Sequence, residues 1–296
     1  MATRQVPILS AMDFELRPGR RTDKAGLAPW TTHTFAWGDY VVDSFDTWLD
    51  QPQSCVLVAA DDADQPIAIG RGVLLSPDEL WLQGVRVHPD WRRRGVASAL
   101  GGRLEIWGAE QGARVALLMT EDWNDAARHQ VESVGFRMTA TWHRAFRQTE
   151  HSGMAGMQVP TPPDPLQRAG PAEVAPAFQA WSRGDLNLAA RSMMAVSWQW
   201  RRLHAADLAR AAEHGALLAG QTGWAIAAPR DNNLEVGWIQ TSPDHARAHL
   251  EALLAVAVNE TAAALQVMLP DMGWLLEAAT AAGFELETLL LFEKPL

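Results

Sequence analysis

Short apolar runs separated by turn residues alternate with amphipathic stretches along the first half of the chain. The runs have the length and the apolar content of buried strands, and they cover residues 54–60, 67–75, 80–87, 115–120 and the stretch after 136. After Gly95, apolar residues recur at helical spacing from Val96 to Trp107, which predicts an amphipathic helix packed on a sheet. Asn124 is a good N-cap for a second helix, and Gly135 is a good residue to end it.

The second half repeats this plan in outline. It offers strand-like runs at 216–220, 224–228, 234–240, 264–269 and 285–292, with helical patterns at 245–260 and 272–282. Gly84 would correspond to Gly237 at an offset of 153, and Gly135 to Gly283 at an offset of 148. The near-constant offset favours a duplicated domain.

A Pro/Gly-rich stretch separates the two regions. It covers residues 151–176, contains VPTPPDPLQRAGP and lacks a clear hydrophobic period. A chain of 296 residues is long enough for two domains with sizeable cores. We therefore predict a first domain at 1–150, a linker at 151–176 and a second domain at 177–296.

Composition and charge narrow the classes of partner. The formal net charge of −10 argues against nucleic acid and against an anionic membrane surface as general partners. Every apolar run is too short or too interrupted to span a bilayer, and we see no secretion signal at the N-terminus. The single cysteine, Cys55, lies in a strand-like run and fits a reducing compartment. We expect a cytoplasmic protein, either a monomer or a homodimer.

Against this acidic background, the run VRVHPDWRRRGVASAL places a basic loop between a strand and a helix. Backbone N–H groups at a helix N-terminus bind phosphate, and Gly95 and Ala97 keep that backbone approachable. Arg92 to Arg94 add attraction for an anion. The alternative is a solvated arginine turn before an ordinary helix. The loop has neither the Walker nor the Rossmann glycine pattern.

The order of these features resembles the GCN5-related N-acetyltransferase (GNAT) superfamily. Residues 92–97 resemble the family's cofactor loop, and Asn124-x-x-Ala127 followed by Gly135-Phe136 resembles its second signature. The resemblance covers residues 14–146 well and 170–296 in outline. It implies an α+β protein with α/β-type layering: two tandem acyl-CoA N-acyltransferase folds, each a mixed, mostly antiparallel sheet flanked by helices, the second degenerate.

The resemblance also implies acetyl-CoA as co-substrate and no metal. Backbone groups of the strand would pair with the pantetheine arm, loop amides would hold the pyrophosphate, and Asn124 and Ala127 would lie along the outer part of the arm. The residues implied are Val85, Arg86, Val87, Arg92, Arg93, Arg94, Gly95, Val96, Ala97, Ser98, Asn124 and Ala127. Asn124 also has the simpler role of an N-cap.

The family's usual proton donor and base are not carried over. The donor position, seven residues after Asn124, is Val131, and the base position, five residues before it, is Met119. His129 is about 200° around a helix from Val131 and would point away. The remaining candidates for a catalytic role are Tyr40, His33, Gln83 and Glu121. For each of them the alternative is a role in packing or on the surface.

The sequence says least about the acceptor of the acetyl group. The resemblance implies acetyl transfer to a primary amine of a small molecule or amino acid; the alternatives are a protein or peptide amine, and a non-catalytic coenzyme A-binding or scaffold protein. Asp39, Asp43 and Asp46 with Trp37 and Trp48 would suit a cationic amine, or form an amphipathic helix with solvated aspartates. The same segment resembles histidine N-acetyltransferase-like proteins over a short run.

Overall fold

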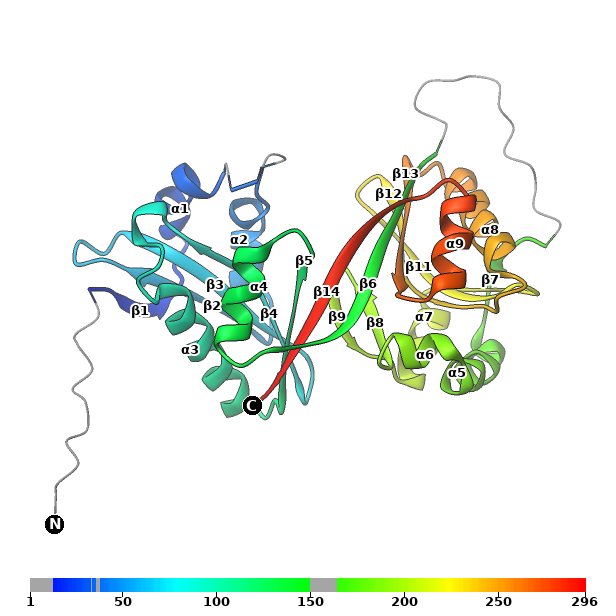
Figure 1. The fold of residues 1–296 in the computed structure, drawn as a ribbon, viewed down its shortest axis with the longest axis horizontal. Coiled ribbons are helices and arrows are strands. Elements are labelled where there is room, and N and C mark those ends of the chain that lie inside the picture. The colour runs from blue at the N-terminus through cyan, green and yellow to red at the C-terminus, as the bar shows by residue number, and fades with distance from the viewer. Residues whose placement is uncertain (1–12, 33, 36–37, 150–163) are drawn as a thin grey trace, which may run out of the picture. The chain divides into compact units, whose positions relative to one another are not determined.

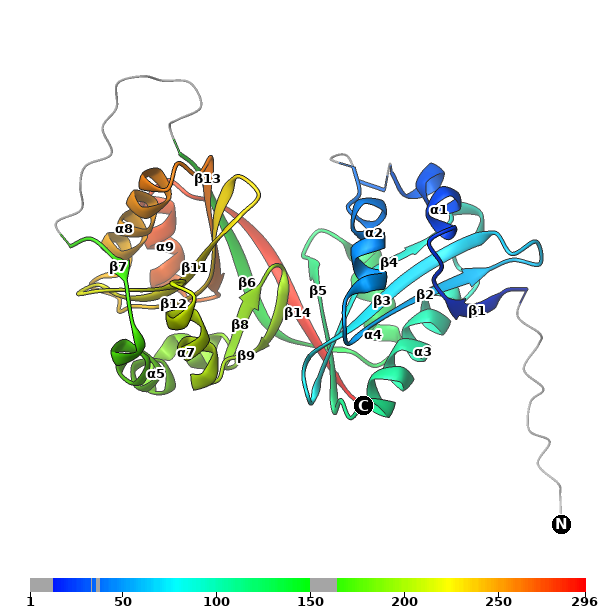
Figure 2. The same ribbon diagram turned by 180° about the vertical axis from the view of Figure 1, so that it is seen from behind.

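The structure, a computed structural model, describes residues 13–32, 34–35, 38–149 and 164–296. The chain divides into two compact units, Met1–Leu117 with Lys294–Leu296, and Leu118–Glu293. Figures 1 and 2 show the elements of each unit from opposite sides.

The sheet of the first unit confirms four of the five strands predicted in the first half and adds β1, which was not predicted. Its order is β1-β2-β3-β4-β5, with antiparallel neighbours except for the parallel pair β4–β5. The strands are β1 Glu15–Pro18, β2 Ser54–Ala60, β3 Pro66–Ser76, β4 Glu79–Val87 and β5 Val115–Glu121, whose last residues count with the second unit.

Helices cover both faces of this sheet (Figure 1). Helices α1 (Asp23–Thr31) and α2 (Val41–Asp50) pack on one face, and α3 (Val96–Glu110) packs on the other. Helix α2 buries Phe45 and Trp48, and each such side chain contributes roughly 1.5–3 kcal/mol to folding. The predicted amphipathic helix after Gly95 is confirmed as α3.

The sequence pattern did not predict α1, and its composition explains why. Gly26 and Pro29 lie inside the helix and interrupt its apolar period. A Cβ atom on Gly26 would lie 2.6 Å from the ring of Pro66, so only glycine allows the helix to come this close to β3. Tertiary packing therefore compensates for the poor helix propensity of this segment.

The sheet of the second unit has the order β14-β6-β13-β12-β11-β10-β7. Only β12 and β13 are parallel among its described pairings. Strand β6 precedes the predicted linker, yet it pairs with β13 on one side and β14 on the other. The strands are β6 Arg137–Gln148, β7 Gln167–Arg168, β10 Leu217–Gly220, β11 Gly223–Arg230, β12 Asn233–Gln240, β13 Ala264–Pro270 and β14 Glu285–Pro295.

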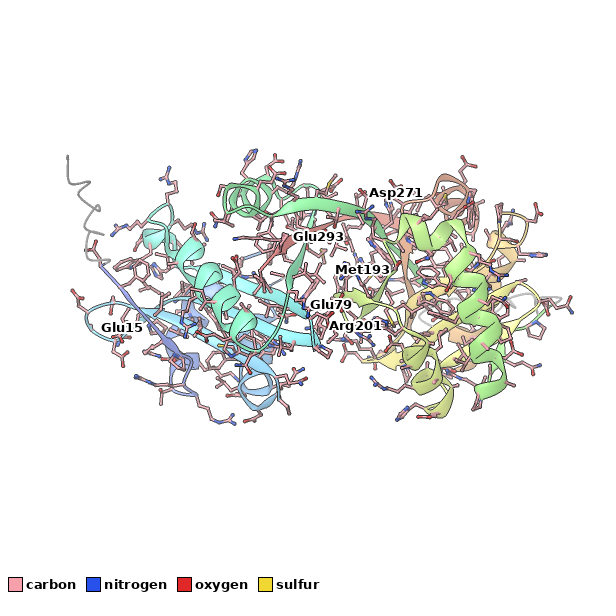
Figure 3. The ribbon with its side chains drawn as sticks, turned by 90° about the horizontal axis from the view of Figure 1, so that it is seen from below. Glu15, Glu79, Met193, Arg201, Asp271 and Glu293 are labelled. Atoms are coloured by element: carbon pink, nitrogen blue, oxygen red, sulfur yellow. The ribbon has the colours of Figure 1, made fainter. Side chains whose placement is uncertain are left out.

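Helices and one hairpin complete this unit. The hairpin consists of β8 (Met193–Val196) and β9 (Gln199–Arg202), on which Figure 3 labels Met193 and Arg201. The helices are α4 Asp125–Ser133, α5 Val174–Arg183, α6 Asp185–Ala189, α7 Ala205–Glu213, α8 Ala246–Asn259 and α9 Gly273–Ala281. In the described part of the chain, no helix combines the length and hydropathy needed to cross a bilayer.

Both halves of the chain follow one order of elements, which supports the duplication. In each half two antiparallel strands, β3–β4 or β11–β12, lead through a helix to a strand parallel to the second of them. Gly135 and Gly283 end the next helices with φ of 96° and 78°. The following phenylalanine N–H then reaches back to the helix, from Phe136 to Val131 O and from Phe284 to Ala279 O. The domain boundaries at 150 and 177 stay a prediction.

Candidate active site

Strand β4 pairs with β5 at its start and continues to the loop before α3. Within the first unit, which includes β5 up to Leu117, their parallel pairing runs from Glu79↔Val115 to Trp81↔Leu117. Strand β4 continues to Val87 and stays paired with β3 on its other edge. The rest of β4, from Leu82 to Val87, leads toward the loop before α3, and a strand-like ligand can add to the edge of such a strand.

A β-bulge at Gly84 lies on this edge. The register with β3 shifts between Ile69 and Arg71, and Gly84 has φ of +68°. A Cβ atom there would lie 2.6 Å from the indole ring of Trp48. Glycine is thus required both by the backbone conformation and by the close approach of α2.

The loop that follows β4 leads into the N-terminus of α3. Arg93 and Gly95 adopt positive φ of 61° and 78°, and the first helical bond runs from Ala99 N–H to Gly95 O at 2.9 Å. A Cβ atom on Gly95 would meet nothing within 4 Å, so the backbone here is open. Amides of the first helical turn have no carbonyl of their own helix in front of them, and together with the helix dipole they form an anion site.

The three loop arginines are exposed and partly tied to the loop. Arg92 Nε donates to Val87 O at 3.3 Å, and the Arg94 guanidinium lies 5.0 Å from the Trp91 ring centroid. They place positive charge beside the start of α3. This charge and the open amides suit a ligand that carries several phosphates.

Arg86 differs from these arginines because its charge is compensated. Its Nε atom lies 2.6 Å from Asp39 Oδ2, and the Asp39 carboxylate is fully buried. The Arg86 guanidinium also lies 4.9 Å from the ring of Phe35 and 5.5 Å from that of Tyr40. The side chain of Arg86 therefore anchors the segment before α2, while its backbone remains on the β4 edge.

A second feature of the first unit, which we call the Trp48 cluster, consists of Trp48 and three residues around it: Tyr40, Arg71 and Gly84. The Tyr40 ring meets the Trp48 ring edge-on at 5.9 Å, and the Arg71 guanidinium lies 5.2 Å from the Trp48 centroid. Tyr40 is 39% exposed at the start of α2. Gln83 adjoins the cluster as the cross-strand partner of Arg71. Two predicted catalytic candidates, Tyr40 and Gln83, thus come together here.

The acidic residues of α2 and the segment before it do not form an open cage. Asp39 is bound to Arg86, and Asp46 contacts Lys24 at 2.6 Å and Arg21 at 3.3 Å. The hydrogen bond from Lys24 is the main cause of the lowered pKa of Asp46. Asp43 is exposed. Two of the three carboxylates are thus engaged by cations of the chain itself, which leaves little to hold a cationic amine.

The remaining candidates fall elsewhere. Asn124 Oδ1 accepts from Ala127 N–H at 3.2 Å, so Asn124 is the N-cap of α4, as the simpler interpretation expected. Glu121 ends β5 and is partly exposed, and His129 is exposed on α4. All of these belong to the second unit. His33 and Trp37 lie outside the described residues.

Sequence reasoning missed Arg71. It lies in the middle of the apolar run predicted as strand 67–75 and is only 2% exposed. An arginine inside a buried strand is rare unless it has a partner or a function. Its position within an apolar run is therefore a signal in the sequence that could have identified it.

The counterpart of Gly84 in the second unit is covered. A Cβ atom on Gly237 would lie 2.0 Å from the carbonyl oxygen of Ala195, because strand β8 passes directly over it. The loop that follows has no glycine, and α8 begins after His245, whose φ of −110° is ordinary. The second half thus lacks the open glycine loop of the first, and its bulge glycine is covered by backbone, whereas Gly84 is covered by the side chain of Trp48.

His245 and His249 have the spacing of a two-histidine metal site, but the structure separates their roles. His249 is fully buried and its Nδ1 lies 3.1 Å from Thr222 Oγ1. His245 is exposed and contacts Ser242 Oγ at 3.1 Å. Among the described residues, no three potential ligands converge on one point.

The buried histidine predicts an acid-sensitive unit. Burial lowers the pKa of His249 to about 4, with a smaller opposing effect from the Trp224 backbone. In the unfolded chain its pKa is about 6.5, so the unfolded state gains a proton first as the pH falls. Stability is therefore lost between about pH 6.5 and about pH 4, and we expect a loss of about 2 kcal/mol between pH 7 and pH 5 from this residue.

Urea unfolding at pH 7 and pH 5 measures this loss. His249→Gln should remove about 2 kcal/mol of the pH dependence, whereas His245→Gln, the exposed control, should leave it unchanged. Equal pH dependence in all three proteins would contradict the assignment.

Comparisons with known proteins agree with the geometry. Residues 26–136 match the family model described as acetyltransferase (GNAT) family. No curated protein matches the sequence. A GCN5-related N-acetyltransferase from Sphaerobacter thermophilus is 11% identical with a TM-score of 0.67, over 96% of this chain and 96% of that chain.

Two further solved structures cover nearly the full length. A putative acetyltransferase from Thermoplasma acidophilum is 15% identical, with a TM-score of 0.57 over 97% of this chain and 93% of that chain. A tandem GNAT protein from the clavulanic acid biosynthesis pathway is 12% identical, with a TM-score of 0.56 over 95% of this chain and 98% of that chain. At these identities the similarity concerns the fold, and its extent agrees with two tandem copies.

Proposed function

We propose that this chain, whose residues 26–136 match the GNAT acetyltransferase family model, transfers the acetyl group of acetyl-CoA to a primary amine of a small molecule. The observation that carries the proposal is the open glycine loop after β4, which leads into the N-terminus of α3. Backbone from Val85 to Val87 would bind the pantetheine arm, and amides from Arg93 to Ser98 would bind the pyrophosphate. The exposed arginines at 92–94 would attract the phosphates.

Bound acetyl-CoA supplies an activated acetyl group, whose carbon–sulfur bond is exchanged for a carbon–nitrogen bond to the amine. An ammonium ion cannot attack, so a proton must leave the amine, and the departing thiolate must gain one. Tyr40 is the proposed donor, because its ring contacts Trp48, whose indole lies against the Gly84 bulge. With Met119 and Val131 at the family's usual positions, we propose that water completes the removal of the amine proton.

Thiol release from acetyl-CoA across a panel of primary amines tests the function. Release that depends on both the amine and the enzyme supports it, and Tyr40→Phe should lower kcat at least about 10-fold while leaving the acetyl-CoA Kd unchanged. Because Gly237 is covered and the second loop lacks glycine, calorimetry should find one coenzyme A per chain.

A second candidate is a coenzyme A-binding protein without catalysis, favoured by the apolar residues Met119 and Val131. Saturating acetyl-CoA would then raise the melting temperature, while no small amine, peptide or protein amine would release thiol. If acetyl-CoA does not raise the melting temperature at all, both candidates are wrong.

A further inference from the structure

Arg71 is a buried cation at the centre of β3. It is 2% exposed, its Nε donates to Ser54 Oγ at 2.9 Å, and its Nη2 donates to Gln51 Oε1 at 2.5 Å. Its Nη1 donates to no acceptor in the part of the chain that the structure describes. These neutral partners accept some of its hydrogen bonds but do not neutralise its positive charge.

The other well-buried arginines of the first unit are paired with carboxylates. Arg17 binds Asp23 at 2.8 Å and Asp64 at 2.7 Å, and Arg86 binds Asp39 at 2.6 Å. Among the described residues, no carboxylate contacts Arg71. Burial lowers the pKa of Arg71 to about 10, partly opposed by Tyr40, so the guanidinium is still charged at pH 7. Leaving such a charge without a counterion is costly, and an arginine with only a packing role would be expected to have one.

The place of Arg71 in the Trp48 cluster connects it with the proposed reaction centre. The Trp48 indole contacts the Arg71 guanidinium and also lies against Gly84 at the bulge. Gln83, the cross-strand partner of Arg71, is the residue before Gly84. One indole ring thus separates the cation from the strand edge where the thioester would lie. The phosphates of coenzyme A have their proposed site at the start of α3. A group that binds at Arg71 would therefore be part of the acceptor.

We propose that Arg71 binds a carboxylate of the acceptor, so that the acceptor class is amino acids and related amino-carboxylates. This inference rests on the proposed function. A guanidinium presents parallel N–H donors that match a carboxylate, and a low dielectric strengthens the pair. The carboxylate would supply the counterion that the described residues do not provide, and it would direct the amine of the same molecule toward the β4 edge.

Matched pairs of acceptors test the proposal. The kcat/KM for thiol release is measured for amino acids and for their carboxamides, which keep the amine and the side chain but lack the negative charge. The wild-type enzyme should prefer the carboxylates by about 100-fold, because a carboxamide leaves the buried charge unpaired. Carboxamide amines lose their proton more easily, so without an anion site the preference would run the other way.

Variants of Arg71 separate recognition from folding. Arg71→Met should reduce the preference for carboxylates to less than about 3-fold and should leave the acetyl-CoA Kd unchanged. Arg71→Lys should keep a preference of about 10-fold, a tenth of the wild-type value. Arg114→Gln, which removes an exposed arginine of the same unit, is the control and should keep the full preference. The melting temperature of ligand-free Arg71→Met should equal or exceed that of the wild type, because an uncompensated buried charge is gone.

Each result decides one question. If carboxamides react as well as amino acids, the inference is wrong and the proposed function stands. If no amine releases thiol, the proposed function fails, and binding decides the inference: N-acetyl amino acids, with coenzyme A present, should raise the melting temperature of the wild type and not of Arg71→Met. If N-acetyl amino acid amides raise it equally, Arg71 does not bind a carboxylate.

Discussion

Ala97→Asp is expected to weaken coenzyme A binding by at least about 100-fold, which corresponds to about 3 kcal/mol, without destabilising the free protein. Ala97 is the second residue of α3 and partly exposed. A carboxylate at this position complements the helix dipole and would stabilise the free helix by about 0.3–1 kcal/mol. The same charge would repel a pyrophosphate at the helix N-terminus. Binding and stability should thus change in opposite directions.

Isothermal titration with coenzyme A and thermal unfolding of the free protein measure both effects. The control is Ala97→Asn, whose side chain has nearly the same shape as aspartate but no charge. It should weaken binding by less than about 10-fold. A Kd for Ala97→Asp within a factor of about 3 of the wild type would show that the phosphates bind elsewhere.

Gly237→Ala is expected to destabilise the second unit by about 3 kcal/mol or more. The added methyl carbon would lie 2.0 Å from the Ala195 carbonyl oxygen, which is backbone and cannot rotate away. Either the hairpin β8–β9 moves off the sheet or β12 shifts, and both expose buried residues such as Met193 and Trp200. Urea unfolding followed by tryptophan fluorescence measures the loss.

Gly273→Ala is the matched control. Gly273 is the first residue of α9, and a Cβ atom there would meet nothing within 4 Å. Its free energy of unfolding should therefore stay within about 0.5 kcal/mol of the wild type or rise slightly. If Gly237→Ala also stays within about 1 kcal/mol, β8 does not rest on Gly237 in solution.

The larger elements were predictable because each carries a local signal. The apolar run at 54–60 became β2 with the same bounds, and the 3.6-residue period after Gly95 became α3. Segments without such a signal were missed. Helix α1 contains Gly26 and Pro29, and the strands of the β8–β9 hairpin have four residues each, too few for a reliable alternation.

For the candidate site, the sequence by itself determined the position of the glycine loop that we propose binds phosphate, because a glycine at a helix start and adjacent arginines act through local backbone geometry. It also determined that the family's usual acid and base positions are apolar. Only the tertiary structure decided which charges remain uncompensated. Asp39 and Arg86 are 47 residues apart and neutralise each other. The side chain of Arg71 instead contacts Ser54, Gln51 and Trp48, and no carboxylate among the described residues. Partners that neutralise a charge are set by packing between distant segments, and no local period in the sequence encodes them.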